Sequence, residues 1–322
     1  MAKRAFIKSF AKVNLYLDVI CKRPDGYHNI ETIFQTVSLA DSIEIELTPS
    51  VIRIYSDHPL VPADENNLAF KAFVVFKKAV GYHGGVRISL RKRVPPGSGL
   101  GGGSSNAAAL IVGLNHLLRA GLTEEHMRRI GARIGADVPF FISGGLAAAW
   151  RLGDKLKLLV PESRSYIVVA IPRGVAVSTV AAYKMVSAPK CNGTAPRSLS
   201  QCSDKLKTFV SALGLRKSLS ENEGVISLLR NSLEGPIFAR HPEIERVKNS
   251  LLKAGARGAL MTGSGSAVFG LASSLAHARK IKKTVEKSRV CDCFVTRTTN
   301  SGSVLSENIK IIKNVHFIAR PR

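Results

Sequence analysis

Apolar and polar residues alternate along the first part of the chain, with the two-residue period of a half-buried β-strand. In the first such run, Val13, Leu15 and Leu17 fall on one face, and Lys12 and Asn14 fall on the other. The runs that predict strands cover residues 6–19, 30–39, 42–47, 51–55 and 86–93. The pattern therefore predicts an N-terminal sheet in which Lys12 and Asn14 stand side by side on a polar strand face.

Helical patterns follow and interrupt these strands. The expected helices cover residues 68–80, 106–120 and 124–134. The run Asp64-Glu65-Asn66-Asn67 is expected to cap the first helix, which Gly81 closes. Ser104 or Ser105 is expected to cap the second helix, and Thr123 the third. Because strands and helices seldom alternate strictly, the order of elements predicts an α+β layer architecture.

The second half of the chain repeats both kinds of pattern. Strands are expected over residues 166–171, 259–261, 266–271 and 290–297. Helices are expected after a cap at Ser178 or Thr179, and over residues 205–213, 224–229, 242–253 and 275–287, with one more short element within 309–318. We place a domain boundary near residue 160. It divides the chain into a domain of residues 1–160, a domain of residues 161–298 and an extension of residues 299–322.

A glycine-rich stretch between the strand of residues 86–93 and the Ala-rich helix carries the main chemical signal. It consists of Pro95, Pro96, Gly97, Ser98, Gly99, Leu100, Gly101, Gly102, Gly103, Ser104 and Ser105. Glycine reaches positive φ without steric cost, so this backbone can approach a ligand closely. Where such a loop opens a helix, free N–H groups and the positive end of the helix dipole point the same way. We expect the stretch to bind phosphate.

Three known phosphate-binding loops fit this stretch poorly. A P-loop needs a lysine after its last glycine, but Gly103 is followed by serine. The dinucleotide fingerprint should leave a buried parallel strand directly, whereas Pro95 and Pro96 separate the loop from a half-exposed strand. A protein kinase would carry H-R-D and D-F-G motifs downstream, and the sequence has neither.

Asp137 lies just beyond the third expected helix and before Pro139. Helix C-termini repel anions, so stability alone does not favour a carboxylate at this place. A purely structural role stays open, because aspartate is common in turns.

Four segments together resemble the GHMP small-molecule kinases. They are the glycine-rich stretch, residues 12–17 with residues 23–28, residues 135–141, and residues 262–267. The resemblance is most specific to the branch that phosphorylates a cytidine diphosphate-bearing alcohol on the non-mevalonate route to isoprenoid precursors. It implies a two-domain fold, with an N-terminal mixed α/β sheet layer domain and a smaller C-terminal α+β domain. Kinases of the same family that act on mevalonate, homoserine or a sugar remain an alternative.

The resemblance also implies roles on the phosphate side of the site. ATP would be the co-substrate, with its phosphates on the backbone of the glycine-rich stretch and Mg2+ between them. Lys12 and Asp137 would be the catalytic pair, with Asp137 accepting the proton of the attacking hydroxyl. Further expected contacts are Asn67 and Lys92 near the base of ATP, Ser104 or Ser105 at the metal, and a second glycine turn, Gly263, Ser264 and Gly265, that packs against the first loop and closes the phosphate site.

On the acceptor side, the resemblance implies a set of residues around a cytosine ring. His28 would bond the edge of the ring, and Tyr27 and Tyr183 would stack on its two faces. Thr179 would contact the same ligand, and Asn14 would orient the attacking hydroxyl.

The formal net charge of +24 favours anionic ligands. Aromatic residues amount to only 6%, and the Lys and Arg residues are spread along the chain. We therefore expect small phosphorylated ligands and no specific nucleic-acid partner, with a basic RNA-associated protein as the alternative. Without a recognisable apolar span or signal peptide, a cytoplasmic enzyme with no membrane partner is expected. Monomer and homodimer both stay open.

The five cysteines, an odd and scattered set, predict free thiols in a cytosolic chain. They are Cys21, Cys191, Cys202, Cys291 and Cys293. The last two share one face of an expected strand, which favours burial over metal binding.

Overall fold

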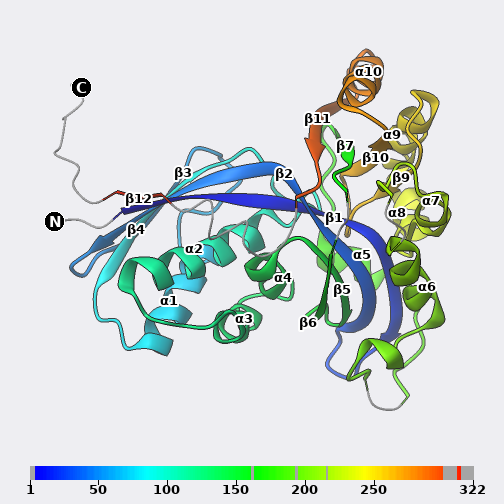
Figure 1. Ribbon diagram of the computed structural model, residues 1–322. Helices are drawn as coiled ribbons and strands as arrows, with labels where there is room; N and C mark the ends of the chain where they lie inside the picture. The colour runs from blue at the N-terminus through cyan, green and yellow to red at the C-terminus, as the bar shows by residue number, and fades with distance from the viewer. Residues whose placement is uncertain (1–3, 161–162, 193–194, 215–216, 300–309, 313–322) are drawn as a thin grey trace.

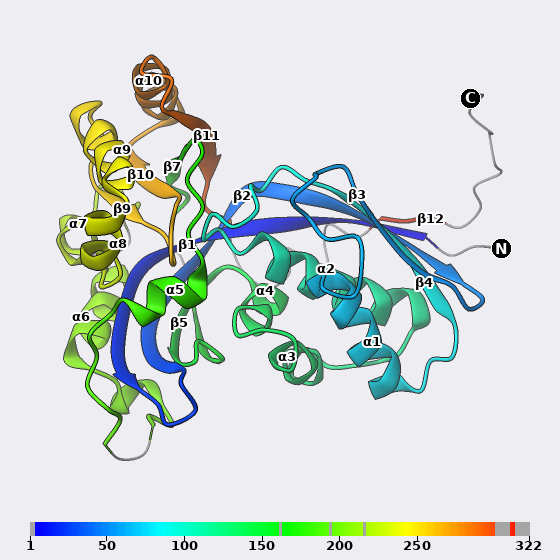
Figure 2. The ribbon, with the colours of Figure 1, turned by 180° about the vertical axis from the view of Figure 1, so that it is seen from behind.

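The computed structural model (Figure 1) describes residues 4–160, 163–192, 195–214, 217–299 and 310–312. Within these ranges the strands form a larger sheet of eight strands and a smaller sheet of four. A layer of helices covers one face of the larger sheet, and further helices pack against the smaller sheet (Figures 1 and 2). The structure therefore has the predicted α+β layer architecture, with a larger N-terminal part and a smaller C-terminal part.

The first part of the chain builds most of the larger sheet and its helical layer. Its elements are β1 (Arg4–Lys22), β2 (His28–Thr48), β3 (Ile52–Ser56), α1 (Leu68–Val80), β4 (Gly85–Arg91), α2 (Gly102–Leu118), α3 (Glu124–Ala132), α4 (Val138–Ser143), β5 (Leu146–Arg151) and β6 (Lys155–Leu159). The apolar faces of α1 to α4 meet the sheet in a core that includes Phe73, Phe76 and Phe140.

Two strands, β1 and β2, are much longer than the alternation predicts. β1 has 19 residues and β2 has 21, and they pair antiparallel over almost their whole length. The expected strands over residues 30–39 and 42–47 are one strand, which pairs with β5 through its first half and with β4 through its second. The pairing of β1 with β2 is irregular between Asn14 and Tyr16. Such irregularities re-aim side chains, here next to the polar face that carries Lys12.

Helix boundaries follow the expected capping residues with one exception. Asn67 caps α1 through its side chain, and Gly81 ends that helix in the left-handed conformation with φ 67°. Thr123 caps α3. The Ala-rich helix, by contrast, begins at Gly102 rather than at residue 106, after Gly101 with φ 74°. The expected cap by Ser104 or Ser105 is therefore wrong, because the glycine-rich loop itself turns into the first turn of α2.

The second part of the chain forms the smaller sheet, in the antiparallel order β11-β7-β10-β9, and its helices. Its elements are β7 (Tyr166–Pro172), α5 (Thr179–Lys184), a 3-10 turn (Leu199–Gln201), α6 (Asp204–Leu213), α7 (Glu223–Leu228), β8 (Arg230–Asn231), α8 (Glu234–Arg240), α9 (Pro242–Lys253), β9 (Ala259–Met261), β10 (Val268–Ala272), α10 (Leu275–Glu286), β11 (Cys291–Arg297) and β12 (Lys310–Ile312). The pattern did not predict α8 or β8, which are only seven and two residues long.

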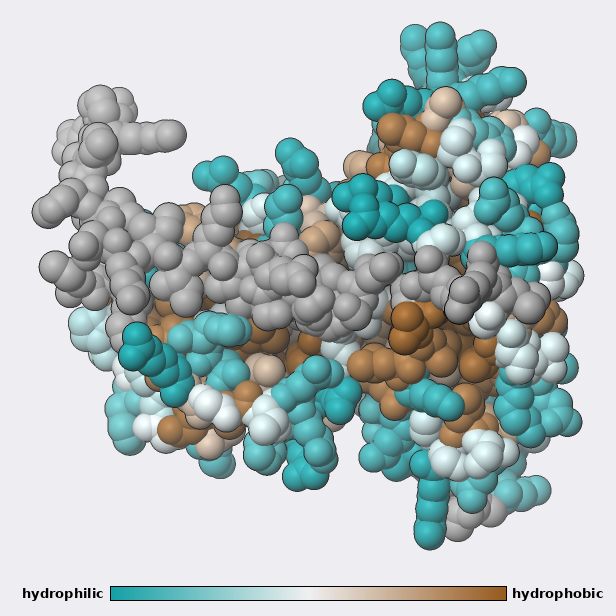
Figure 3. Space-filling view, viewed as in Figure 1, coloured by the Kyte–Doolittle hydropathy of each residue, from teal (hydrophilic) through white to brown (hydrophobic). Residues whose placement is uncertain are grey.

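The last helix and the extension also match expectation where the structure describes them. α10 buries Ala278, Ile281 and Val285, and its outward side is hydrophilic (Figure 3). The short element expected within residues 309–318 is β12, which pairs antiparallel with the start of β1. The rest of the predicted extension, apart from residue 299, lies outside the described residues.

The cysteine prediction is wrong for one pair. Cys21 and Cys191 form a disulfide across 170 residues of sequence. The end of β1 and the segment after α5 lie side by side, a neighbourhood that only the fold creates. Cys202, Cys291 and Cys293 are free and buried, as expected.

Candidate active site

Lys12 is the centre of a buried polar cluster on β1. Its side chain is only 4% exposed. The ammonium Nζ donates a 2.6 Å hydrogen bond to Asn14 Oδ1, and Asn14 Nδ2 donates to Thr32 Oγ1 on β2 at 2.8 Å. Because the two positions share a strand face, as the alternation predicted, the amide fixes the ammonium in one orientation.

Asp137, the residue that precedes α4, also lies near Lys12. The distance between Lys12 Nζ and Asp137 Oδ2 is 3.7 Å, and the carboxylate is 30% exposed. Burial lowers the pKa of the Lys12 ammonium, and the Asp137 carboxylate partly opposes that shift. In the sequence, Asp137 follows the end of a helix. The structure also makes it the N-terminal flank of α4, where a carboxylate is favourable.

The glycine-rich loop lies over this pair in a conformation that needs its glycines. Gly97, Gly99 and Gly101 have φ values of 68°, 80° and 74°. A side chain at Gly99 would come within 2.3 Å of the backbone oxygen of Thr262. The Lys12 N–H donates to Leu100 O at 3.0 Å, so the loop is attached directly to β1.

The second glycine turn packs against the first loop, as expected. The Ala267 N–H donates to Ser98 O at 3.0 Å, and the Asn14 N–H donates to Thr262 Oγ1 at 3.0 Å. A Cβ atom at Gly263 would lie 3.3 Å from Lys12 Nζ. Both glycine turns therefore meet at the ammonium of Lys12, although residues 97–105 and 262–267 are far apart in sequence.

The buried carboxylate of Asp41 on β2 binds the backbone of Arg93 and Val94, which lead into the glycine-rich loop. Its oxygens accept from the N–H groups of Arg93 and Val94 at 2.7 and 2.8 Å and from Asn106 Nδ2 at 2.9 Å, and they form an ion pair with Lys92. The pattern missed Asp41, but a signal existed, because an acidic residue stands between two runs that both predict strands. The network ties the strand end before the loop to the helix after it.

The two residues expected near the base of ATP are engaged in the protein interior. Lys92 Nζ binds Asp41 and, at 3.0 Å, Asn106 Oδ1. Asn67 accepts from the Ala69 N–H at 2.9 Å and donates to Pro62 O at 2.7 Å. Both side chains support the loop and α1, and their contact with a nucleotide stays a prediction.

The structure separates the two serines offered as metal ligands. Ser105 is 1% exposed, and its hydroxyl accepts a 2.9 Å hydrogen bond from Ser9. Ser104 is half-buried in the first turn of α2, and its Oγ lies near Gly135, two residues before Asp137. Ser104 is thus the better placed of the two. Among the described residues, no cluster of three or more His, Cys, Asp or Glu side chains has metal-binding geometry.

The residues expected on the acceptor side come from three separate segments, and two of them, Asn14 and Thr179, contact the second glycine turn or Thr262 just before it. The rings of His28 and Tyr183 stack with centroids 5.6 Å apart, and Thr179 Oγ1 lies 3.0 Å from Ser264 Oγ. Burial, with a contribution from Lys22, lowers the pKa of His28 below 6.5. Burial and the charge of Asp137 raise the pKa of Tyr183.

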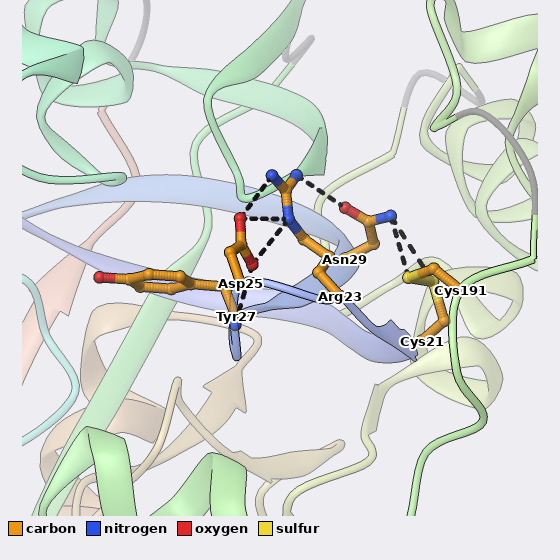
Figure 4. Close-up of a disulfide and its surroundings, with 6 residues drawn as sticks. All are labelled: Cys21, Arg23, Asp25, Tyr27, Asn29 and Cys191. Carbon is orange, nitrogen blue, oxygen red and sulfur yellow. Dashed lines mark hydrogen bonds and ion pairs between the residues drawn. A yellow bond between two sulfur atoms is a disulfide. The ribbon is translucent and has the colours of Figure 1, made fainter.

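Tyr27 differs from the other acceptor-side residues because its side chain is not packed. The residue is 65% exposed, and it points away from the disulfide region (Figure 4). His28, rather than Tyr27, is the ring that stacks on Tyr183. The expected sandwich of a cytosine between Tyr27 and Tyr183 therefore stays a prediction.

Known family models match both parts of the chain. The family description GHMP kinases N terminal domain matches residues 67–145, and GHMP kinases C terminal matches residues 210–290. In the ranges described, no helix has the length and apolarity to cross a membrane.

Curated relatives cover nearly the whole chain. One from Gloeobacter violaceus is 37% identical over 95% of this chain and 98% of its own length, and one from Geobacter sp. is 42% identical over 89% and 96%. Both are named 4-diphosphocytidyl-2-C-methyl-D-erythritol kinase.

Solved structures show the same fold. A crystal structure of 4-(cytidine 5'-diphospho)-2C-methyl-D-erythritol kinase is 34% identical and has a TM-score of 0.72 over 92% of this chain and 99% of its own. A homoserine kinase from Cytophaga hutchinsonii, at 23% identity, shares the fold with a TM-score of 0.70 over 97% of each chain. Two glycine turns that meet at a lysine and aspartate pair, and relatives that match from end to end, lead to one conclusion: the chain belongs to the GHMP kinase family.

Proposed function

We propose that the protein transfers the γ-phosphoryl group of ATP to the 2-hydroxyl of 4-diphosphocytidyl-2-C-methyl-D-erythritol, a step on the non-mevalonate route to isoprenoid precursors, in the cytoplasm. The observation that carries the proposal is the convergence of Lys12, Asp137 and both glycine turns on one point. The acceptor follows from the names of relatives that are 37% and 42% identical over most of the chain.

The glycine-rich loop would hold the phosphates of ATP. Its backbone N–H groups and the N-terminus of α2 offer partial positive charge to an anion. Contacts to Asp41 and to the second glycine turn already fix the loop. Binding therefore requires little ordering of this part of the protein, which favours the precise alignment that phosphoryl transfer needs.

Asp137 would act as the base and Lys12 as the charge-stabilising group. The Asp137 carboxylate is exposed enough to meet an incoming hydroxyl, whereas Lys12 is buried behind it. As the hydroxyl attacks phosphorus, its proton passes to Asp137, and the ammonium of Lys12 stabilises negative charge on the transferred group. Asn14 holds Lys12 in place at 2.6 Å and would orient the same hydroxyl.

The cytidine end of the acceptor would lie along His28, Thr179 and Tyr183. The lowered pKa of His28 keeps its imidazole neutral near pH 7, so the ring offers one donor and one acceptor to the edge of cytosine. Tyr183 offers an aromatic face to the base, and Tyr27 is free to cover the other face.

The residues at the phosphate site also suit a magnesium ion. Mg2+ prefers oxygen ligands and usually reaches proteins through one or two side chains together with substrate phosphates and water. Ser104 Oγ and the partly exposed Asp137 carboxylate are oxygen donors on this side of the loop. When bound, the ion would neutralise charge on the phosphates.

A direct assay tests the proposal. The purified protein is supplied with ATP, Mg2+ and, separately, the cytidine-bearing acceptor, mevalonate and homoserine, and ADP release is measured. We expect turnover with the cytidine-bearing acceptor and a kcat/KM at least a hundredfold lower with the other two. Equal turnover of mevalonate or homoserine would refute the assigned acceptor. Salt-sensitive RNA binding without any kinase activity would instead support the RNA-associated alternative.

A further inference from the structure

The Cys21–Cys191 disulfide joins two segments that both lead to the acceptor side of the site. Cys21 is near the end of β1, seven positions before His28, and Cys191 follows Tyr183 by eight positions. Backbone hydrogen bonds flank the link, because the Lys22 N–H donates to Pro189 O at 2.8 Å and the Cys191 N–H donates to Lys22 O at 2.9 Å. The disulfide therefore holds the segment after α5 against the β1–β2 turn.

A chain of hydrogen bonds connects the sulfur atoms to Tyr27 (Figure 4). Asn29 Nδ2 lies 3.5 and 3.4 Å from the sulfurs of Cys21 and Cys191, and Asn29 Oδ1 accepts from Arg23 at 3.5 Å. Arg23 forms a 2.7 Å ion pair with Asp25, whose Oδ1 accepts the Tyr27 N–H at 3.1 Å. A change between disulfide and thiols at Cys21 and Cys191 would therefore act, through these hydrogen bonds, on the turn that carries Tyr27 and His28.

The sulfur atoms are also within reach of a small reagent. Both cysteines are half-buried rather than enclosed, and both line a cavity of about 150 Å3 together with Asn29 and Trp150. Thiol–disulfide exchange needs a thiolate to approach one sulfur along the S–S axis, so access decides whether a disulfide reacts. The free cysteines, Cys202, Cys291 and Cys293, are buried.

We propose that Cys21 and Cys191 form a thiol–disulfide exchange site that controls binding of the cytidine-bearing acceptor, an inference that rests on the function proposed above. In reduction, a thiolate of a dithiol attacks one sulfur and forms a mixed disulfide. The second thiol of the reagent then displaces the protein sulfur. The protein gains two electrons and two protons as two thiols, and the dithiol becomes a disulfide. An external disulfide reverses the step.

The disulfide form is the one that binds the acceptor well. Without the link, the segment after α5 and the β1–β2 turn must be ordered again when the acceptor binds, and ordering a few side chains costs about tenfold in affinity. The donor side does not share this cost, because the glycine-rich loop is attached to β1, Asp41 and the second glycine turn. Reduction should raise KM for the acceptor about tenfold and change KM for ATP less than twofold.

The test compares the full chain after dithiothreitol and after oxidised dithiothreitol, each followed by removal of the reagent. Thiol titration in denaturant should give three thiols in the oxidised form, because Cys202, Cys291 and Cys293 are free, and all five in the reduced form. KM for each substrate is then measured in both forms. Cys21→Ser with Cys191→Ser should show the KM of the reduced form and no redox response, whereas Cys202→Ser should respond like the unmodified protein.

Trypsin provides a readout that does not depend on kinase activity. Lys22 and Lys190 flank the disulfide and are exposed, so cleavage at these sites should be about tenfold faster in the reduced form. An equal KM for the acceptor and equal cleavage in both forms would overturn the exchange site. A different result would separate the two proposals: neither form phosphorylates the cytidine-bearing acceptor, but the thiol count and the cleavage rate still change. In that case the proposed acceptor is wrong, and the proposed control of its binding is wrong too.

Discussion

The proposed phosphate side and the proposed acceptor side of the site are built in different ways. On the phosphate side, Lys12, Asn14 and Asp41 are buried, and each has several partners in the protein. On the acceptor side, Tyr27 is exposed, and the segment that carries Tyr183 is attached to the β1–β2 turn by a disulfide and a few backbone bonds. One side is fixed before any ligand binds, and the other retains freedom.

This difference suits the chemistry of each side. Phosphoryl transfer depends on alignment of charges, which a buried hydrogen-bonded network provides in advance. Recognition of a large acceptor through aromatic faces tolerates more adjustment, because stacked rings contribute contact over a range of centroid separations. Substitutions on the phosphate side should therefore change kcat or stability, and substitutions on the acceptor side should change KM.

The largest effect is expected from Asp137→Asn. Removal of a general base lowers turnover by two to four orders of magnitude, so kcat should fall about a thousandfold. The amide keeps the shape of the side chain, and ATP affinity should change less than twofold. Steady-state kinetics and nucleotide binding by fluorescence measure the two quantities.

Glu125→Gln is the matched control for this substitution. Glu125 is 64% exposed on α3 and pairs with Arg129 of the same helix. The kcat of the Glu125→Gln variant should stay within twofold of the kcat of the unmodified protein. A loss of less than tenfold in Asp137→Asn would rule out Asp137 as the base.

The next largest effect concerns stability rather than turnover. Asp41→Asn leaves the buried Lys92 ammonium without its counter-charge, and removal of one member of a buried ion pair costs about 3 kcal/mol of unfolding free energy. Urea denaturation measures this loss. Glu44→Gln on the same strand breaks a partly exposed pair with Arg4 and should cost less than about 1 kcal/mol. Equal losses for the two variants would show that the network beneath the loop does not hold the phosphate side.

A smaller effect is expected from Tyr183→Ala. An aromatic contact is worth about 1 kcal/mol, so its loss should raise KM for the acceptor by about fivefold to tenfold. The value of kcat should not fall by a matching factor. Tyr55→Ala, which removes a half-exposed ring on β3, should leave both constants unchanged. A fall in kcat with constant KM would contradict a role of Tyr183 in binding the acceptor and would assign it to the phosphate side of the site.

The smallest effect is the pH dependence of His28. Its pKa is lowered in the folded protein, so the unfolded chain takes up this proton first as the pH falls through 6.5. The contribution of His28 to stability is therefore complete above pH 6.5 and is lost below it. KM for the acceptor should be constant from pH 8 to 6.5 and should rise only at lower pH.

His28→Gln, which stays neutral, should remove the rise at low pH. Measurement of KM from pH 5 to 8 for both proteins tests the assignment. A rise that begins well above pH 6.5 in the unmodified protein would contradict it.

The sequence predicted the parts of the fold and site that depend on local pattern. Alternation placed Lys12 and Asn14 on one strand face, and Asn67 and Gly81 marked the ends of α1. The convergence of Lys12 with Asp137 came from the resemblance to a family, because no local rule brings residues 125 positions apart within 3.7 Å.

Other features could not be predicted from the sequence, because they arise only from long-range packing. Asp41 appears from sequence as a break between two strands, yet burial within one long strand makes it the anchor of the loop. The start of α2 depends on how far a positive-φ glycine turn can continue into a helix. The partner of Cys21 depends on where the segment after α5 runs.

The length of β1 and β2 has a consequence for how the protein can be divided. Leu17 and Ile30, near the far end of this pair, belong to the apolar core of the C-terminal part, and β8 pairs directly with β1. A fragment that stops near residue 160 would expose these side chains to water, and the remaining fragment would lack the wall they provide. Each half alone would therefore leave part of an apolar core uncovered, and the two halves stabilise each other.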